Sequence, residues 1–238
     1  MAASALVNSA NTLFSATDNA AFYGTTAFTA SLWFKLTADP TNYATTFGNQ
    51  NGATTGWSMA ASESAGANNL KPTATVSDGT DAPATTDTTA QTVNTWVFIA
   101  MTFDGSNIRY YRGTESVSPA LITTVAQSGS MATGGSALGF GGSPLDTANI
   151  RSTRVSDFRI YNATVRTLGA IQNDYLSRLN GTETGLTDYW KFNDGSGNTA
   201  VNSTSARNAT ATAGSWVADE PAYVSLPAGG EIAYAYFM

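Results

Sequence analysis

Two apolar runs joined by a short polar link stand out in residues 94–113, NTWVFIAMTFDGSNIRYYRG. Residues 96–101 are apolar at every position, so both faces of the strand that they predict are apolar. Such a strand is central in its sheet and covered on both sides. Asp104-Gly105 supplies the turn, because glycine tolerates a positive φ, and residues 108–111 resume an extended, aromatic-rich strand. The pattern predicts a β-hairpin.

Further runs of strand length follow, with turn residues between them. Short strands at this spacing indicate an all-β protein built as an antiparallel β-sandwich. These runs are FTASLWFKL (28–36), NYATTFGN (42–49), GWSMAAS (56–62), ALITTVA (120–126), SALGFGG (136–142), TRVSDFRIY (153–161) and DYWKF (188–192).

One short helix is expected among the strands, over residues 163–179. Apolar side chains recur there at intervals of three and four, which gives one apolar face, and Asn180-Gly181 is a suitable stop. The residues of this face are Val165, Leu168, Ile171, Tyr175, Leu176 and Leu179.

Residues 71–93 have a different composition from the predicted strands. They contain few bulky apolar groups, two prolines and many threonines, alanines and aspartates, so we expect a long loop with room for one weak strand. The C-terminal stretch EIAYAYFM (231–238) is apolar and aromatic, and such a stretch has to pack inside this chain or against another.

Composition and charge narrow the range of partners. Only 12% of the residues are charged, and alanine, threonine, serine, glycine and asparagine fill the polar stretches, which is typical of secreted or particle-surface β proteins. The net charge is −6, and the lysines and arginines are scattered singly, so we expect no nucleic-acid partner. No apolar run is long enough to span a bilayer, so membrane insertion is not expected. Residues 1–14 also lack the basic start of a secretory signal.

The chain contains no cysteine and no histidine, which excludes thiolate and Ser-His-Asp nucleophiles and the usual zinc sites. Retaining glycoside hydrolysis needs two carboxylates about 5 Å apart, as residues i and i+2 of one strand can provide. No Glu-x-Asp, Asp-x-Glu or Glu-x-Glu occurs. We therefore predict no catalytic residue and expect the protein not to be an enzyme.

Taken in order, FTASLWFKL, the hairpin at 94–113, ALGFGG and VSDFRIYNATVRTLGAIQNDY resemble the successive signatures of a laminin-G-like domain of the concanavalin A-like lectin/glucanase superfamily. The resemblance covers roughly residues 11–180. It implies a jelly roll of two curved antiparallel sheets, a topology that alternation alone does not supply. It also implies that Trp33, Trp96 and Phe103 are core aromatics.

Residues 186–216 resemble the opening segment of such a module, yet they follow the closing helix. Only about 58 residues follow Asn180, too few for a second sandwich of roughly 100 residues. We therefore expect one domain over residues 1–238, in which residues 181–238 form a C-terminal segment that folds back onto the sandwich.

Two kinds of binding site can be weighed from the residues. Glycan binding usually needs an exposed aromatic platform, and Tyr43, Trp57 and Trp216 are candidates because small polar residues flank each of them. Against each stands the fact that a tryptophan in a sandwich more often belongs to the core.

Calcium is the metal that the resemblance favours, and SDGTD (77–81) and NDGSGN (193–198) are oxygen-rich. Neither matches an EF-hand loop, and turn chemistry explains both equally well. No residue is therefore assigned as a metal ligand, and no cofactor is predicted.

Our leading interpretation is a non-catalytic surface or assembly protein, such as a virion decoration or tail component or a cell-surface structural protein. It would be extracellular or lie on a particle surface, and its partners would be other protein subunits, either copies of itself or a particle surface. Deleting Ala233 to Met238 would then weaken self-association. The alternative is a free, lectin-like carbohydrate-binding module with glycan partners. A third interpretation, a glycan hydrolase, needs two carboxylates from different strands.

Overall fold

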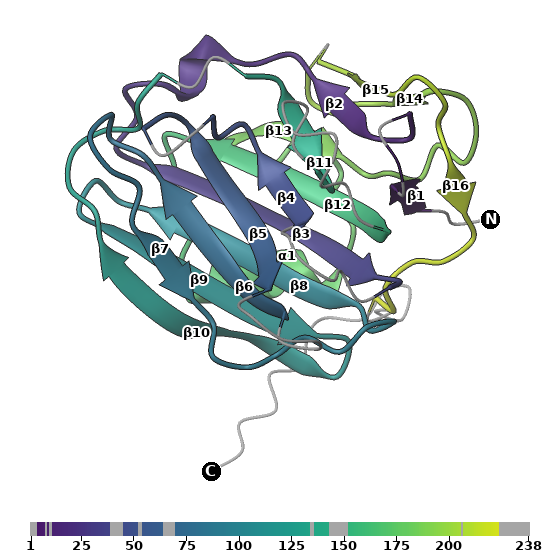
Figure 1. The fold of residues 1–238 in the computed structure, drawn as a ribbon, viewed down its shortest axis with the longest axis horizontal. Coiled ribbons are helices and arrows are strands. Elements are labelled where there is room, and N and C mark those ends of the chain that lie inside the picture. Colours follow the sequence, from purple (N-terminus) through teal and green to yellow (C-terminus); the bar gives the residue numbers. More distant parts are fainter. Residues whose placement is uncertain are drawn as a thin grey trace.

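The residues that the computed structural model describes are 4–7, 9, 11–38, 45–51, 54–63, 70–133, 136–142, 152–205 and 207–223. They form two antiparallel β-sheets that face each other, with the helix α1 (Leu168–Leu176) behind one of them (Figure 1). The expected all-β sandwich is confirmed, and its architecture is consistent with the expected jelly roll. No helix in this part of the chain is long and apolar enough to span a membrane.

The first sheet contains eight of the described strands. In spatial order seven of them run β10, β9, β8, β3, β12, β1, β16, and β13 also pairs with β12. Their bounds are β1 (Ser4–Val7), β3 (Phe28–Leu36), β8 (Val97–Phe103), β9 (Asn107–Thr114), β10 (Val117–Ala126), β12 (Thr153–Asn162), β13 (Leu186–Trp190) and β16 (Trp216–Val217).

The second sheet also contains eight described strands, in the spatial order β14, β15, β2, β11, β4, β5, β6, β7. A short 3-10 helix, η1 (Ala20–Phe22), connects β2 to β3. The strand bounds are β2 (Phe14–Ala16), β4 (Thr45–Gly48), β5 (Trp57–Glu63), β6 (Leu70–Val76), β7 (Ala84–Thr86), β11 (Leu138–Phe140), β14 (Thr199–Ala200) and β15 (Ala209–Thr210).

The predicted hairpin is β8 and β9. Every residue of β8 is buried, and the strand lies between β3 and β9, as its two apolar faces require. The Asp104 carboxylate accepts the backbone N–H groups of Ser106 at 3.0 Å and Asn107 at 2.7 Å, and Gly105 has a φ of 80°. The turn is therefore built from the residues that the sequence indicates. The seven other predicted runs also overlap observed strands, and β3 has the predicted bounds.

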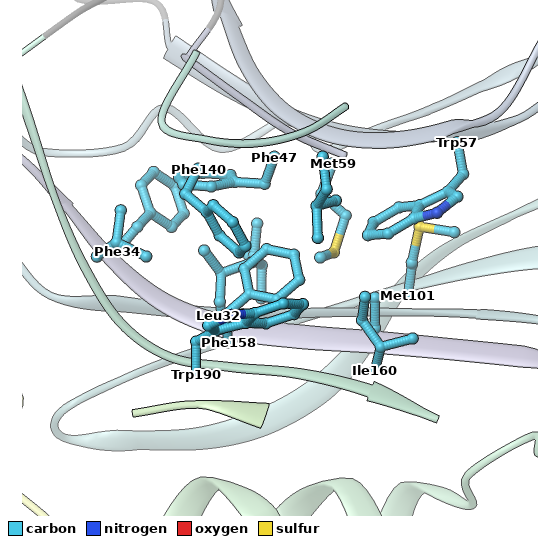
Figure 2. Close-up of a cluster of buried hydrophobic side chains, with 14 of the residues drawn as sticks. Leu32, Phe34, Phe47, Trp57, Met59, Met101, Phe140, Phe158, Ile160 and Trp190 are labelled. Carbon is cyan, nitrogen blue, oxygen red and sulfur yellow. The ribbon is translucent and has the colours of Figure 1, made fainter. Parts of the chain in front are cut away.

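The main core lies between the two sheets. Figure 2 shows side chains of the second sheet, including Phe47 and Met59, pointing toward Leu32, Phe158 and Ile160 of the first. A second buried cluster lies on the opposite side of the first sheet, where the helix packs against Phe98 and Tyr111 among others. Phe103 belongs to the main core, whereas Trp33 and Trp96 belong to the cluster under the helix, so all three are buried as expected.

The helix is shorter than the prediction of residues 163–179. It begins after Thr167, whose hydroxyl accepts the backbone N–H of Ala170 at 3.2 Å, and it ends at Ser177, whose backbone is extended. The expected stop at Asn180-Gly181 is wrong because Arg159, from the sheet beneath, donates to the carbonyls of Asp174 and Ser177 and so satisfies the free end of the helix early.

The predicted apolar face of the helix is only partly buried. Ile171 and Tyr175 are buried in the second cluster, and the ring of Tyr175 stacks on Trp33 at 5.1 Å. Val165 and Leu168 are more than a third exposed, because the chain before residue 168 is not helical and does not follow the predicted periodicity.

The sequence predicts a long loop with room for one weak strand over residues 71–93, whereas the structure has two paired strands there, β6 and β7. β6 pairs with β5 over seven residues, from Leu70 opposite Glu63 to Val76 opposite Trp57, and β7 pairs with β6. Ala74 and Val76 are buried while the intervening threonine is not, which is the period-2 pattern of a strand carried by small side chains. The pairing partner, rather than side-chain bulk, makes this segment a strand.

The described residues after Asn180 pair with both sheets. β13 pairs with β12 and β16 with β1, whereas β15 pairs with β2. The buried Asp188 carboxylate accepts Arg207 Nη2 at 2.8 Å and Asn202 Nδ2 at 2.6 Å, so an ion pair holds this segment together. The apolar stretch at 231–238, and the proposed deletion within it, lie outside the described residues.

Candidate functional site

A pocket of about 230 Å³ lies beside the loop that connects β7 to β8. Val97 and Thr114, which are directly paired across β8 and β9, mark the end of the hairpin opposite the Asp104-Gly105 turn. The loop and this hairpin end together enclose the pocket. The residues that line it are Thr89, Ala90, Gln91, Thr92, Thr95, Val97, Arg112 and Thr114.

Strand alternation brings a charged side chain to the pocket. Ile108, Tyr110 and Arg112 lie on the same face of β9, and the first two are buried in the core between the sheets. The guanidinium of Arg112 therefore enters the space between the sheets, where it meets a carboxylate that follows β7. Arg112 Nη1 lies 2.8 Å from Asp87 Oδ2, and the Asp87 side chain is 1% exposed.

The same ion pair holds the start of the pocket loop. Asp87 Oδ1 accepts the backbone N–H of Thr89 at 2.8 Å, and Arg112 Nη1 donates to the carbonyl of Thr89 at 3.1 Å. Both polar groups of the Thr89 backbone are thus bound to the two charged side chains. The loop is positioned by hydrogen bonds to a charge pair, which are among the stronger hydrogen bonds in proteins.

Tyr110 adds a neutral hydroxyl to this cluster. Burial, and then the negative charge of Asp87, raise the pKa of Tyr110 well above its ordinary value, so the hydroxyl stays protonated. The hydroxyl has no hydrogen-bond partner within the described residues. The buried groups beside the pocket are therefore polar, and the opposite charges of Arg112 and Asp87 offset each other.

Gln91 is the notable group in the pocket. The residue is 6% exposed, and its Oε1 and Nε2 atoms are both buried without a hydrogen-bond partner in the part of the chain that the structure describes. Leaving a buried polar group unpaired costs about 1–3 kcal/mol. Beside this amide, Val97 is 4% exposed and forms an apolar part of the lining, whereas Thr89 and Thr92 are exposed at the rim. The pocket offers hydrogen-bond donors and acceptors next to an apolar surface.

None of the eight lining residues is acidic. The Asp87 carboxylate, which contacts the lining residue Arg112, also accepts the backbone N–H of Thr89. This arrangement can bind a polar molecule, but it presents no pair of groups for general acid and general base catalysis.

The structure corrects the suggestion that Trp57 is an exposed platform. Trp57 is 0% exposed and lies in the main core (Figure 2). Its ring centroid is 4.9 Å from that of Phe28. It shares a strand face with the buried Met59, and the polar neighbours that suggested exposure, such as Ser58, alternate to the other face.

The other two suggested platform residues do not reach the pocket either. Trp216 is half-buried, donates Nε1 to the carbonyl of Gly197 at 2.8 Å and packs edge-on against Phe14, so its indole attaches the C-terminal segment to the sandwich. Tyr43 lies outside the described residues. Neither Trp57 nor Trp216 lines the pocket, and the two belong to different sheets.

The two oxygen-rich stretches have turn roles. Asp78 Oδ1 accepts the backbone N–H groups of Thr80 at 2.8 Å and Asp81 at 3.1 Å, and these bonds lower the pKa of Asp78. In the second stretch, Asp194 accepts the N–H of Val201. Within the described ranges, no three Asp, Glu, His or Cys side chains are grouped so that they could hold a metal ion.

Sequence reasoning did not single out Asp87, Gln91 or Arg112. Two of them fall in the segment that composition assigns to a loop. A signal for Arg112 was present, however, because the alternation of Ile108, Tyr110 and Arg112 places a charge on a core-facing side, where it needs a partner.

Similar architectures occur among solved structures. A candidate carbohydrate-binding protein from Bacteroides ovatus aligns with a TM-score of 0.66 and 13% identity over 94% of this chain, which spans 63% of that protein's length. A heptameric SAP-like pentraxin from Limulus polyphemus aligns with a TM-score of 0.51 and 8% identity, over 72% of this chain and 80% of its own. A GH54 α-L-arabinofuranosidase aligns with a TM-score of 0.52 and 13% identity, over 83% of this chain and 49% of its own.

At these identities the structural likenesses show the fold alone. No curated protein sequence matches the chain. The sequence model of the concanavalin A-like lectin/glucanases superfamily matches residues 8–172, which is more than half of the chain, and agrees with the observed sandwich. The chain therefore belongs to the concanavalin A-like lectin/glucanase superfamily.

Proposed function

We propose that this protein binds carbohydrate without transforming it, and that the pocket lined by Gln91 and Arg112 is its glycan site. One observation carries the proposal: a pocket of about 230 Å³ brings the Arg112 guanidinium and several threonine hydroxyls next to the apolar side chains of Val97 and Ala90.

The lining matches the chemistry of a sugar. Each sugar hydroxyl is both a donor and an acceptor, and the pocket offers the Arg112 guanidinium and several threonine hydroxyls. The C–H groups of a sugar ring need apolar contacts, which Val97 and Ala90 provide. A few placed polar groups beside apolar surface are typical of small-molecule sites.

The family and the fold comparisons support the same class of ligand. The superfamily takes its description from lectins and glucanases, and the neighbour from Bacteroides ovatus is a candidate carbohydrate-binding protein. Many glycans that proteins bind are found outside the cell, so an extracellular location is part of the proposal. Neither the comparisons nor the described surface gives support for a virion or structural role.

Absence of catalysis is also part of the proposal. Glycoside hydrolysis requires two carboxylates flanking the scissile bond, and no lining residue carries one. The carboxylate of Asp87, which is not among the lining residues, forms an ion pair with Arg112.

A glycan array followed by calorimetry tests the proposal. We expect at least one glycan on the array to bind the protein. Gln91→Ala changes the shape of the pocket lining and should weaken that binding by about tenfold or more, which corresponds to about 1.4 kcal/mol. Gln127→Ala is the matched control, because Gln127 is also buried but does not line the pocket. If no glycan is retained, or if Gln91→Ala binds as tightly as the parent chain, the proposed function is wrong.

A further inference from the structure

We propose that the apolar stretch at residues 231–238 docks on its own chain, against the edge strand β10 and the start of the helix α1. This inference goes beyond glycan binding and does not depend on it. The surface that the stretch would cover is named here the β10–α1 patch. Its residues are Val117, Leu121, Ile122, Val165 and Leu168.

Exposed apolar side chains are concentrated on this patch. Six large apolar side chains in the described part of the chain are exposed, by between 38% and 59%, and five of them belong to the patch. The sixth is Val201. Single exposed apolar side chains are ordinary on a protein surface, whereas a group of them at one place marks an interaction surface.

The contacts between α1 and β10 fix the direction of the helix over the strand. Tyr175, near the end of the helix, donates its hydroxyl to the carbonyl of Thr114, just before β10, at 2.5 Å. Earlier in the helix, Gln172 Nε2 donates to the carbonyl of Pro119, within β10, at 3.0 Å. The start of the helix therefore lies farther along β10 than its end does.

This direction brings the apolar side chains of the two elements together. Leu168 lies one turn before Gln172 on the same side of the helix, a step of about 5.4 Å. Leu121 lies two residues after Pro119, a step of about 6.6 Å, and pairs with Tyr111, whose ring belongs to the cluster under the helix. Leu168 and Leu121 are thus neighbours where the helix meets the edge strand.

The strand β10 leaves one edge of the first sheet open. Within the described residues it pairs with β9 and with no strand on its other side (Figure 1). Its ten residues include no charge. Charged side chains commonly protect such an edge, and here only Pro119 and two irregularities of register interrupt the strand. The edge is therefore suited to be covered by a further segment of chain.

The sequence supplies a segment with the matching pattern. Residues 231–238, EIAYAYFM, lie outside the described residues and carry one charge. At the period of a strand, the bulky residues Ile232, Tyr234, Tyr236 and Met238 share one face. A segment with one bulky apolar face fits an apolar sheet edge, as in peptide recognition by strand addition.

The described chain leads to this edge. The N–H of Ala222 donates to Glu115 Oε1 at 2.8 Å, and Glu115 lies in the turn between β9 and β10. The next residue, Tyr223, packs against the cluster under the helix. Leu121 is six residues beyond Glu115, about 20 Å along the strand, and residues 224–230 span about 23 Å when extended. The segment can therefore reach the β10–α1 patch of its own chain.

Disulfide cross-linking in the full-length chain tests the proposal, because the chain contains no cysteine of its own. Leu121→Cys is combined in turn with Ile232→Cys, Tyr234→Cys, Tyr236→Cys or Met238→Cys, and each variant is oxidised with glutathione disulfide. We expect at least one combination to form a disulfide within the chain, because this bond requires the two residues to approach closely. Non-reducing electrophoresis and mass spectrometry measure the rate.

The matched control replaces Leu121→Cys by Val201→Cys in each combination. Val201 is equally exposed but follows β14, at the end of the second sheet away from β7 and β10. We expect the fastest combination with Leu121→Cys to form its disulfide at least about tenfold faster than its control.

Hydrogen exchange of the β10 amides gives a second measurement without cysteines. Tyr234→Ser with Tyr236→Ser removes the bulky face of the segment and should speed exchange in β10 by about tenfold or more. Ala233→Ser with Ala235→Ser changes the other face and should alter it by less than about twofold.

Three results would overturn the proposal. Disulfides that form mainly between two chains would place the segment on a second copy of the protein instead of its own chain. Equal rates with Leu121→Cys and Val201→Cys would show that the segment does not dock on the patch. Exchange in β10 that does not respond to the tyrosine substitutions would show that the bulky face does not cover the strand.

Discussion

Arg112 Nη1 of the first sheet lies 2.8 Å from Asp87 Oδ2, in the chain that has just left the second sheet. The strands that carry or precede these residues, β9 and β7, are in contact (Figure 1). One ion pair thus connects the two sheets and fixes the backbone of Thr89 at the mouth of the pocket. The ion pair that joins the two sheets therefore also positions the proposed site.

Removing the carboxylate of this pair should destabilise the protein. We expect Asp87→Ala to lower the free energy of unfolding by about 3 kcal/mol, because it leaves the half-buried guanidinium of Arg112 without its partner and frees the N–H of Thr89. Urea denaturation measures the change. Asp81→Ala is the control, since Asp81 is exposed, and should shift stability by less than about 0.5 kcal/mol. Equal effects of the two variants would contradict this account.

The unpartnered amide of Gln91 leads to an unusual pair of effects. Met has a similar size and no hydrogen-bonding group, so Gln91→Met removes the cost of the two unpaired atoms. We expect the ligand-free variant to be more stable by about 1 kcal/mol and to bind sugar less well. Thermal and urea denaturation without ligand check the first effect. A variant less stable by about 1 kcal/mol or more would indicate a structural role for the amide.

A separate buried ion pair holds the helix to the sheet. Arg159 is fully buried and donates to the Asp157 carboxylate at 3.0 Å and to the carbonyl of Ser177 at 2.9 Å. We expect Arg159→Met to lower the free energy of unfolding by about 3–5 kcal/mol, because it leaves a buried carboxylate unpaired. Arg109→Met breaks the more exposed ion pair with Asp104 and should cost less than about 1 kcal/mol. A loss below that of the control would show that the buried pair is not required.

Tyrosine ionisation should govern stability at alkaline pH. Burial, followed by nearby carboxylates, raises the pKa values of Tyr161, Tyr189 and Tyr223. In the unfolded chain these hydroxyls ionise at about pH 10, whereas in the folded protein they are still neutral at that pH. Their contribution to stability is therefore fully present below about pH 10 and is lost as the pH rises above it.

Urea midpoints measured from pH 7 to 11 test this expectation. The midpoint should change little between about pH 7 and 9, because the chain has no histidine or cysteine, and should then fall. Tyr161→Phe should make the alkaline fall shallower. A midpoint that stays constant to pH 11 would show that these hydroxyls are not held neutral by the fold.

The burial of Trp57 can be tested by mutation. Because its indole is fully buried, we expect Trp57→Ala to lower the free energy of unfolding by about 3–5 kcal/mol. Trp216→Ala should cost about 1–2 kcal/mol, since that indole is only half-buried. Calorimetric unfolding distinguishes the two. A small cost at Trp57 would indicate that the side chain is not part of the core.

The hairpin could be predicted because its signals are local. Consecutive apolar residues require a strand covered on both sides, and Asp104-Gly105 can close a tight turn by itself. The helix bounds could not be predicted, because Arg159, several residues earlier in the chain, satisfies the carbonyls that end it. The strand β6 was missed because its alternating residues are small and its pairing partner is β5.

The candidate site could not be predicted from the sequence, because contacts between segments that are distant in the chain form it. Asp87 and Arg112 are brought together because β7 of one sheet contacts β9 of the other, and Gln91 lies in the loop that this ion pair positions. Flanking polarity also suggested an exposed Trp57, but strand alternation turns the indole inward, away from those neighbours. Burial in a sandwich depends on which face a residue takes and on what lies opposite, neither of which composition reports.

The most direct test of the central claim is an NMR titration of the ¹⁵N-labelled protein with neutral monosaccharides, following the Gln91 side-chain amide signals. The account predicts that these signals shift together with the backbone amides of Thr89, Thr92 and Thr95, while the Trp216 indole signal stays in place. If the sugars leave the Gln91 signals unchanged, or shift only residues away from the pocket, the pocket is not the glycan site.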